Sequence, residues 1–403
     1  AWTKVYAFDA KTGRQLWQYD PHTKGETIRK VCCGIVNRGI AAYRGRIYVG
    51  TLDGRLVALD ARTGKEAWST LTIDPGQQYS VTGAPRIAKG LVFTGVSGAE
   101  YGVRGYVGAY DAETGKQVWR FYTVPRNPAL GQENAALEMA AKTWGDKNDW
   151  WTIGGGGTVW DSIVYDPKTD LLYFGTGNGT PWNQRYRDPD GGDNLFLASI
   201  VAVKASTGEY VWHYQTTPGD TWDYDSVSPM MTADLVIDGR QRHVLMQPCK
   251  NGFMYVLDAK TGELLRADAF TEVNWADGVD LKTGRPRVVP AARYADAAWN
   301  LAPGVQGAHG WHSNAFSPKT GLLYIATQEA YFTMAHDPNY KRALVGSNNG
   351  ARFNAEVPGA KVGFTGYLQA WDPVAAKPVW KTESNQGPAG GALATAGGLV
   401  FQG

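Results

Sequence analysis

Short apolar stretches alternate with polar turns along most of the chain. The pattern is clearest in three segments that end in tryptophan, namely YAFDAKTGRQLW at Trp17, VALDARTGKEAW at Trp68 and GAYDAETGKQVW at Trp119. Each segment predicts a strand, an Asp-x-x-Thr-Gly turn and a second strand. Asp and Thr can hydrogen-bond the turn backbone, and Gly adopts positive φ readily. Looser copies end at Trp212 and Trp380, and degenerate copies begin at Tyr255 and Ala315.

The repeat predicts an all-β fold. A unit of about fifty residues with four short strands is typical of a β-propeller blade. The 50 glycines, 20 prolines and 12% aromatic residues agree with short strands and tight turns. We therefore expect an eight-bladed β-propeller with Trp-docking repeats and incomplete terminal blades; an open solenoid is the weaker alternative. A helix is expected only around Asn134 to Lys142, and residues 271–287 are expected to form a surface loop.

No linker divides the chain, so residues 1–403 are expected to form a single domain, truncated at both ends because both ends fall inside the repeat pattern. The formal charge of +2 gives no reason to expect nucleic acid or an anionic membrane as partner. No apolar run approaches the roughly 20 residues of a membrane helix, so no membrane span is expected. A small, roughly neutral substrate fits this balance.

Cys32 and Cys33 are adjacent, which makes them the most unusual pair in the chain. Neighbouring Cα atoms lie about 3.8 Å apart, below the roughly 4.4 to 6.8 Å of ordinary disulfides, so a bond between them would be strained. Such strain indicates a functional site. Two buried free thiols are the alternative reading. The third cysteine, Cys249, is read as a buried thiol.

The segment TIGGGGTVW, residues 152–160, combines four glycines with Trp160. Bare backbone can approach another group closely, and a flat ligand stacked on Trp160 would explain the pattern. A loop beside a core tryptophan explains it equally well. The glycines lack the strand-to-helix context of a dinucleotide site and the GK[ST] of a P-loop, so nucleotide binding is not predicted.

Oxygen-bearing side chains form the third candidate group: Glu100, Asn178, Asp223 and Asp225. In an extended segment Asp223 and Asp225 point to the same side. Three carboxylates and an amide suit a hard cation such as calcium. Each residue taken alone also has an ordinary explanation as a turn or solvated side chain. The six histidines form no HExxH pattern, which argues against zinc.

Several motifs give the chain a family resemblance. VCCGIVNRG, SGAEYGVRG, GGGGTVW, FGTGNGTPWN, GDTWDYD and CKNGFMYVLDAKTG all resemble segments of the pyrroloquinoline-quinone (PQQ) dependent alcohol dehydrogenases. The resemblance extends over nearly the whole chain. It implies an eight-bladed propeller with PQQ near its axis and a metal ion at the quinone edge.

The resemblance also implies roles for individual residues. Cys32 and Cys33 would form a vicinal disulfide against one face of PQQ, and Trp160 would stack on the other. The residues expected to bind the rim of the cofactor are Arg38, Thr82, Ser97, Ala99, Gly157, Thr158 and Trp311, with Lys250 at the quinone oxygens. The expected metal ligands are Glu100, Asn178, Asp223 and Asp225.

Asp223 would also be the catalytic base, removing the alcohol proton as hydride passes to PQQ, with the metal as Lewis acid. An Asp at position 225 resembles the lanthanide-dependent branch, because a trivalent ion favours one more anionic oxygen. A solvated Asp225 in a calcium enzyme is the alternative. The resemblance further implies a small alcohol substrate, a cytochrome c acceptor, separate or fused, and a periplasmic location.

Two positions depart from the family. The chain has His309-Gly310-Trp311 where many members have Asn before Trp, and Ala389-Gly390 where they have Trp or Asn before the glycines. The loss of bulk favours an alcohol larger than methanol. A non-catalytic propeller scaffold for protein assembly is the rival reading, but it would need none of the candidate residues. A sugar-oxidising quinoprotein usually resembles a different branch.

Overall fold

The protein is built mainly from antiparallel sheets of four strands. The computed structural model describes residues 2–32, 34–343, 346–384 and 390–403. The first two such sheets comprise β3 (Ala41–Tyr43), β4 (Arg46–Gly50), β5 (Arg55–Asp60) and β6 (Glu66–Leu71), then β7 (Arg86–Ala88), β8 (Leu91–Gly95), β9 (Tyr106–Asp111) and β10 (Gln117–Tyr122). The next two comprise β11 (Ile163–Asp166), β12 (Leu171–Gly175), β13 (Ser199–Lys204) and β14 (Tyr210–Gln215), then β15 (Met231–Ile237), β16 (Arg240–Pro248), β17 (Phe253–Asp258) and β18 (Leu264–Ala269).

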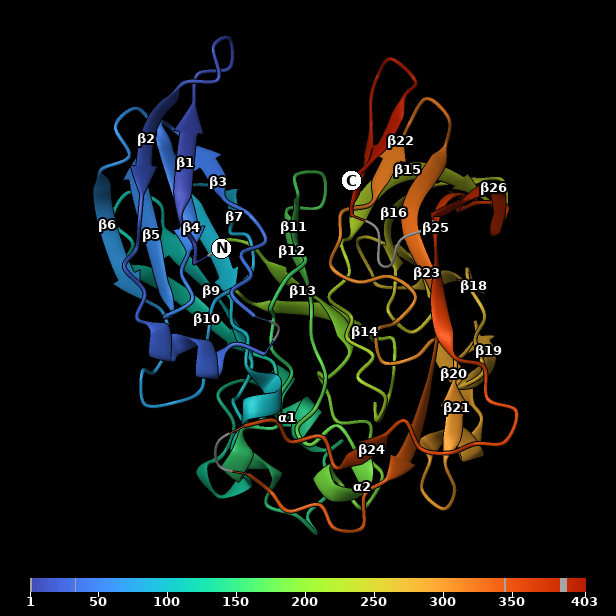
Figure 1. The fold of residues 1–403 in the computed structure, drawn as a ribbon. Coiled ribbons are helices and arrows are strands. Elements are labelled where there is room, and N and C mark those ends of the chain that lie inside the picture. Colours follow the sequence, from blue (N-terminus) through green and yellow to red (C-terminus); the bar gives the residue numbers. More distant parts are fainter. Residues whose placement is uncertain (1, 33, 344–345, 385–389) are drawn as a thin grey trace.

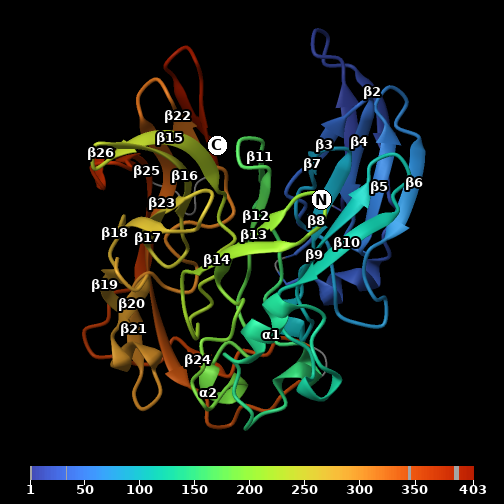
Figure 2. The ribbon, with the colours of Figure 1, turned by 180° about the vertical axis from the view of Figure 1, so that it is seen from behind.

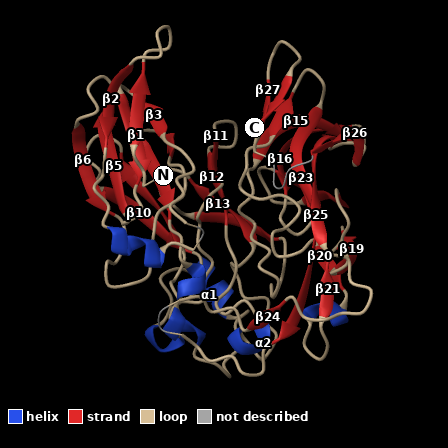
Figure 3. Cartoon of the chain, in the orientation of Figure 1, coloured by secondary structure: helices blue, strands red, loops and turns tan. Residues whose placement is uncertain are grey.

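The remaining sheets are less regular. Three are two-stranded: β1 (Val5–Phe8) with β2 (Gln15–Tyr19), β19 (Ala276–Asp280) with β20 (Arg285–Val288), and β27 (Ala392–Ala394) with β28 (Val400–Gln402). The largest contains β21 (Trp299–Leu301), β22 (Ala315–Ser317), β23 (Leu322–His336), β24 (Ala351–Phe353), β25 (Gly363–Asp372) and β26 (Lys377–Ser384). These assignments confirm the all-β fold (Figure 3).

Short helices lie in the connections between strands. They are α1 (Ala135–Ala141) and α2 (Gln184–Arg187), with 3-10 turns at Gly25–Lys30, Ala99–Tyr101, Pro128–Leu130, Trp150–Ile153 and Pro290–Arg293. Helix α1 confirms the expected helix, and its N-cap Asn134 accepts a hydrogen bond from the backbone N of Leu137. Both α-helices lie at the same end of the molecule, beside β24 (Figures 1 and 2).

The repeated turns form as the sequence predicts. In the second copy, Asp60 Oδ1 accepts hydrogen bonds from the backbone N of Thr63 at 2.8 Å and from its Oγ1 at 2.7 Å. Gly64 follows with φ of 71°, in the left-handed region. The same bonds recur at Asp9, Asp111 and Asp258. These local contacts explain why the short motif specifies a hairpin.

Repeat tryptophans join successive sheets. Trp68 Nε1 donates to Ala112 O at 3.1 Å, and Trp119 Nε1 donates to Ala205 O at 3.0 Å. Trp17 and Trp212 make the corresponding bonds to Ala61 and Ala259. The buried core accordingly lies between neighbouring sheets, which follow one another in an arc from β1 to β28 (Figure 1).

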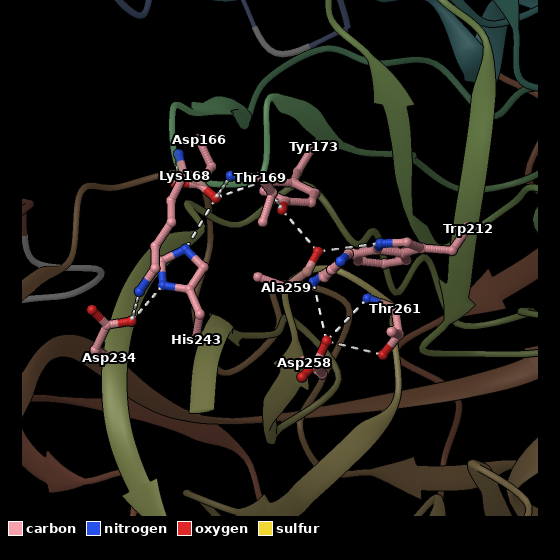
Figure 4. A network of polar contacts seen from close by, with 11 residues as sticks. Asp166, Lys168, Thr169, Tyr173, Trp212, Asp234, His243, Asp258, Ala259 and Thr261 are labelled. Carbon is pink, nitrogen blue, oxygen red and sulfur yellow. Dashed lines mark hydrogen bonds and ion pairs between the residues drawn. The ribbon is translucent and has the colours of Figure 1, made fainter. Parts of the chain in front are cut away.

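A polar network also crosses between β11–β14 and β15–β18 (Figure 4). His243, on β16, contacts Asp166 Oδ2 through Nε2 at 3.0 Å and Asp234 Oδ1 through Nδ1 at 2.7 Å. Asp166 also accepts hydrogen bonds from Thr169, and Lys168 pairs with Asp234 at 2.6 Å. The imidazole thus links two carboxylates from different sheets.

The prediction of a surface loop at residues 271–287 is wrong. The segment contains β19 and most of β20, joined by another Asp-x-x-Thr-Gly turn, in which Asp280 Oδ1 accepts from the backbone N of Lys282 and Thr283. Trp275 is fully buried against Trp222. The polar composition hid the strand pattern, because only Ala276 and Val279 of the two strands are buried, and the other residues are half-buried or exposed.

Candidate active site

Segments far apart in the sequence line one cavity of about 410 Å³. Small-molecule sites commonly have this size. The wall is formed by Val31, Cys32, Gly34, Val36, Arg38, Ser80, Thr82, Ser97, Gly98, Glu100, Thr158, Trp160, Trp182, Asp223, Asp225, Val227, Ser228, Lys250, Val305, Gln306, His309, Gly310 and Trp311. It therefore combines aromatic faces, hydroxyl groups and buried charges.

Aromatic rings and a guanidinium group form one part of the wall. The Arg38 Cζ lies 4.5 Å from the ring centroid of Trp160 and 5.0 Å from that of Trp311. Arg38 Nη1 donates to Thr82 Oγ1 at 2.5 Å, and Thr82 shares a hydrogen bond with Ser97. The arrangement offers flat stacking surfaces beside a positive charge, which suits a planar anion.

The glycine run has a structural cause that the sequence did not show. Residues 154–157 all have φ between 67° and 87°. A Cβ at Gly156 would lie 2.5 Å from Asn178 O, and one at Gly154 would lie 2.3 Å from the carbonyl carbon of Val103. The glycines therefore approach the protein's own backbone, and this packing places Thr158 and Trp160 in the cavity wall.

Charged groups form another part of the wall. Lys250 Nζ donates to Asp223 Oδ2 at 2.8 Å and to Asp225 Oδ2 at 2.9 Å. The other oxygen of Asp225 accepts from the backbone N of Asn178 at 2.9 Å and from Trp160 Nε1 at 3.3 Å. Asp225 thereby connects the lysine, the stacking indole and the Asn178 loop.

Asp223 and Asp225 face the same group, as the alternation predicted. Trp222 and Tyr224 are fully buried in the core on the opposite side. The segment is not regular strand, however, because Asp223 has φ of 67°. Asp220 Oδ1 accepts from the backbone N of Trp222 and Tyr224 and holds this turn.

Burial shifts the acidity of these groups. It raises the pKa of Asp223 well above its ordinary value, and Lys250 partly offsets this effect. Burial, assisted by the charge of Asp225, also raises the pKa of Glu100. Burial alone would lower the pKa of Lys250, but Asp223 and Asp225 outweigh it and raise that pKa. Pairing thus favours the charged forms that burial opposes.

The donor set fits a cation, although no preformed ligand cage is present. Within the described residues, no group of three or more His, Cys, Asp or Glu side chains meets the geometry of a metal site. Asp223 Oδ1 is nevertheless buried without a hydrogen-bond partner. Glu100, Asp223 and Asp225 interact electrostatically with one another, and only Lys250 contacts any of them as a counter-ion among the described lining residues. A bound cation would relieve this excess of negative charge.

Comparison with known protein families decides the assignment. Residues 1–267 match the family described as "PQQ: Glucose/ethanol/alcohol dehydrogenase, beta-propeller domain". The chain belongs to this family. The match also confirms the β-propeller fold and the family resemblance of the sequence motifs.

Several relatives align with the whole length of this chain. It is 53% identical to quinohemoprotein alcohol dehydrogenase ADH IIB of Pseudomonas putida, covering 100% of this chain and 58% of that protein. The crystal structure of the Comamonas testosteroni quinohemoprotein alcohol dehydrogenase matches with a TM-score of 0.96 and 47% identity, covering 100% of this chain and 61% of that one. A europium-containing methanol dehydrogenase matches with a TM-score of 0.89 and 35% identity, covering 99% and 71%. The chain thus spans less than two thirds of the length of the curated relatives.

Most of the residues that the sequence predicts to bind PQQ or the metal ion lie in the cavity wall. They are Cys32, Arg38, Thr82, Ser97, Glu100, Thr158, Trp160, Asp223, Asp225, Lys250 and Trp311. Ala99, Gly157 and Asn178 do not line the cavity. Gly157 instead packs its backbone against Asn178 O and Thr123. Cys33 and Ala389 lie outside the described residues, so the structure does not test the expected disulfide.

Other lining residues escaped the sequence analysis. Val31 and Val36 lie within the VCCGIVNRG motif, whereas Ser80, Val227, Ser228, Val305 and Gln306 lie in none of the quoted motifs. Trp182 lies within the FGTGNGTPWN motif, which was its only signal. No helix in the described part of the chain has the length and apolar character needed to cross a membrane.

Proposed function

We propose that this chain forms the PQQ-binding propeller of an alcohol dehydrogenase, which oxidises a primary or secondary alcohol to an aldehyde or ketone. The observation that carries the proposal is the placement of Lys250 between Asp223 and Asp225 in the same cavity as the stacking ring of Trp160. A non-catalytic scaffold would have no use for this buried charge cluster.

The cavity wall suits PQQ, a planar molecule with several carboxylates. Ser80 Oγ and Thr158 Oγ1 are buried in the wall without hydrogen-bond partners, so they are available to a bound ligand. Trp160 would stack on one face and a Cys32–Cys33 disulfide would cover the other. The rim would be held by Arg38, Thr82, Ser97, Thr158 and Trp311 of the wall, and by Ala99 and Gly157, which are chain neighbours of wall residues. Lys250 would hydrogen-bond the quinone oxygens.

Glu100, Asp223 and Asp225 of the cavity wall would supply oxygen ligands to the metal ion, together with Asn178, which lies behind the wall and contacts Asp225 through its backbone N. Asp225 adds an anionic oxygen, which favours a lanthanide(III) ion over Ca²⁺. The europium-containing methanol dehydrogenase among the structural relatives supports this assignment. When bound, PQQ and the metal would together supply the hydride acceptor and the Lewis acid.

Asp223 would act as the base toward the alcohol proton. Its Oδ1 is the oxygen without a partner, whereas Oδ2 is held by Lys250. Because burial raises the pKa of Asp223, the carboxylate is a stronger base than an exposed aspartate. Lys250 favours the ionised form of Asp223 and fixes the orientation of its carboxylate through Oδ2.

Gly310 leaves room for the substrate. A Cβ there would meet only the His312 ring, at 3.6 Å, so the position would accept a side chain without a clash. We infer that its absence admits an alcohol larger than methanol. Gly310→Asn is expected to lower turnover of 1-butanol more than that of ethanol; an equal loss for both alcohols would contradict this inference.

The wider setting follows from the relatives. We propose an eight-bladed propeller with Trp-docking contacts, in which residues 1–403 form one domain. Electrons would pass to a cytochrome c, separate or fused, because relatives are named as quinohemoproteins and as a cytochrome c-linked 1-butanol dehydrogenase. We place the enzyme in the periplasm, whose oxidising conditions suit a vicinal disulfide.

The test uses the full-length protein, stripped of metal and refilled in parallel with Ca²⁺ or La³⁺ in the presence of PQQ. Ethanol-dependent reduction of a dye is expected with La³⁺ and to be weaker with Ca²⁺. Asp223→Asn should abolish turnover, whereas Asp296→Asn, at an exposed position outside the cavity, should retain it. Absence of turnover with both metals in folded protein would overturn the proposed function.

A further inference from the structure

The charges at the metal-binding part of the cavity do not balance. Glu100, Asp223 and Asp225 are all buried carboxylates, and Lys250 is the ammonium in contact with two of them. When all four groups are ionised, three negative charges and one positive charge leave a net charge of minus two. Lys250 therefore already neutralises part of the negative charge that a bound metal ion would otherwise balance.

The oxygen atoms show where a metal ion and Lys250 would meet. Asp223 Oδ1 is open, but Asp223 Oδ2 and Asp225 Oδ2 both accept from Lys250 Nζ. Asp225 Oδ1 accepts from the backbone N of Asn178 and from Trp160 Nε1. An ion that takes Asp225 as ligand must therefore share or replace one of these existing donors.

The lysine is the donor that can move. The Asn178 N–H belongs to a fully buried backbone segment, and the Trp160 ring follows the tightly packed glycine run. Lys250 instead carries its charge on a flexible four-carbon chain. Replacing Lys250 by a metal ion at Asp225 Oδ2 therefore disturbs the surrounding backbone least.

We propose that Lys250 acts as an internal cation that holds the Asp223–Asp225 pair before metal binding and competes with the metal ion for Asp225. It lowers the affinity of the site for every cation, and most of all for trivalent ones. Lys250 also pairs with two buried carboxylates when no metal is bound. This pairing stabilises the fold, because unpaired buried charges are strongly destabilising.

The charge dependence follows from Coulomb's law. Repulsion between the ammonium and the metal ion scales with the product of their charges, so at equal distance it is one and a half times as large for a trivalent as for a divalent ion. Removing the lysine charge should therefore strengthen lanthanide binding more than calcium binding. A lysine with only a structural role predicts the opposite, because its loss would disorder the carboxylates.

The inference rests on the proposed function, since it assumes that this site binds a metal. Its test is a titration of the PQQ-free full-length protein with Tb³⁺, followed by tryptophan-sensitised luminescence, which requires no turnover. Trp160 is suitably placed as sensitiser beside Asp225. Competition with Ca²⁺ then reports the affinity for the divalent ion.

Lys250→Gln is expected to bind Tb³⁺ at least tenfold more tightly than the wild type, with a smaller gain for Ca²⁺. The control Lys260→Gln removes the same charge from an exposed position in the adjoining turn and should change neither affinity. Lys250→Arg keeps the charge and should stay within threefold of wild type. If Lys250→Gln does not fold, Lys250→Met provides the neutral side chain.

A double-mutant cycle locates the competition. In an Asp225→Asn background, Lys250→Gln should have a smaller effect on Tb³⁺ affinity, because competition for Asp225 is gone and only the direct repulsion remains. Equal or weaker Tb³⁺ binding by folded Lys250→Gln, with normal binding by the wild type, would overturn the competition alone. Absence of Tb³⁺ binding by both proteins would overturn the metal site itself.

Discussion

At the scale of the residue, burial decides which side chains carry charge. His309 is fully buried, and its Nδ1 lies 2.7 Å from Ala326 O, a pure acceptor, so Nδ1 carries the proton. Burial lowers the pKa of His309 to about 4. The ring therefore stays neutral in the cavity wall at neutral pH, and its Nε2 is buried without a partner.

The free energy of unfolding should depend on His309 in mild acid. The unfolded chain takes up the proton near pH 6.5, whereas the folded protein resists it until about pH 4. Stability is therefore lost as the pH falls from 6.5 to 4, by at most about 3 kcal/mol from this group. Urea unfolding at pH 7.5, 5.5 and 4.5 should show a shallower loss for His309→Gln than for the wild type. Parallel curves would contradict the assignment.

At the scale of the element, tryptophans join several successive sheets. Trp119 is largely buried, donates to Ala205 O and packs over Gly208, where a Cβ would lie 2.6 Å from the ring. Trp380 occupies the corresponding place on β26 but is 40% exposed. The two positions therefore provide a matched pair.

Trp119→Phe should lower the free energy of unfolding by about 1 to 3 kcal/mol, because the carbonyl of Ala205 loses its donor in a buried setting. Trp380→Phe should cost less than about 0.5 kcal/mol, as expected for a surface change. Chemical denaturation of both variants measures the difference. Similar losses in the two variants would show that the buried hydrogen bond contributes little.

At the scale of the whole molecule, polar contacts between sheets add to the apolar core. His243→Ala removes the link between Asp166 and Asp234 and leaves the buried Asp166 with fewer donors. We expect a loss of about 1 to 3 kcal/mol in the free energy of unfolding. Lys168→Ala breaks only an exposed ion pair of the same network and should cost about 0.5 kcal/mol or less. Equal losses in the two variants would show that the buried contacts of His243 contribute no more than the exposed ion pair.

Metal binding should stabilise the entire fold, because the cavity joins segments from residue 31 to residue 311. A ligand at one hundred times its Kd adds about 2.7 kcal/mol when it binds only the folded state. The Tm should therefore fall after treatment with a chelator and return with La³⁺. Asp223→Asn should remove this response. If the protein binds the metal but its Tm does not change with the chelator, the predicted stabilisation by the metal is wrong.

The sequence by itself determined the repeat, the turns and the tryptophans that join the sheets. Asp60, Thr63 and Gly64 lie within five residues of one another, so their hydrogen bonds and φ preferences are local. Motif resemblance also marked eleven residues of the cavity wall, among them Arg38 and Trp311. Local patterning failed at β19 and β20, where a hairpin of largely polar sequence resembles a loop.

Only the tertiary structure decided which groups meet in the cavity. Lys250 lies 25 residues beyond Asp225, and Trp160 lies 65 residues before it, yet both contact Asp225. Likewise the glycine run is required by the backbone of Val103 and Asn178 rather than by an evident ligand. Such contacts depend on how successive sheets pack, and that packing sums many weak apolar interactions between distant segments. No short stretch of sequence contains them.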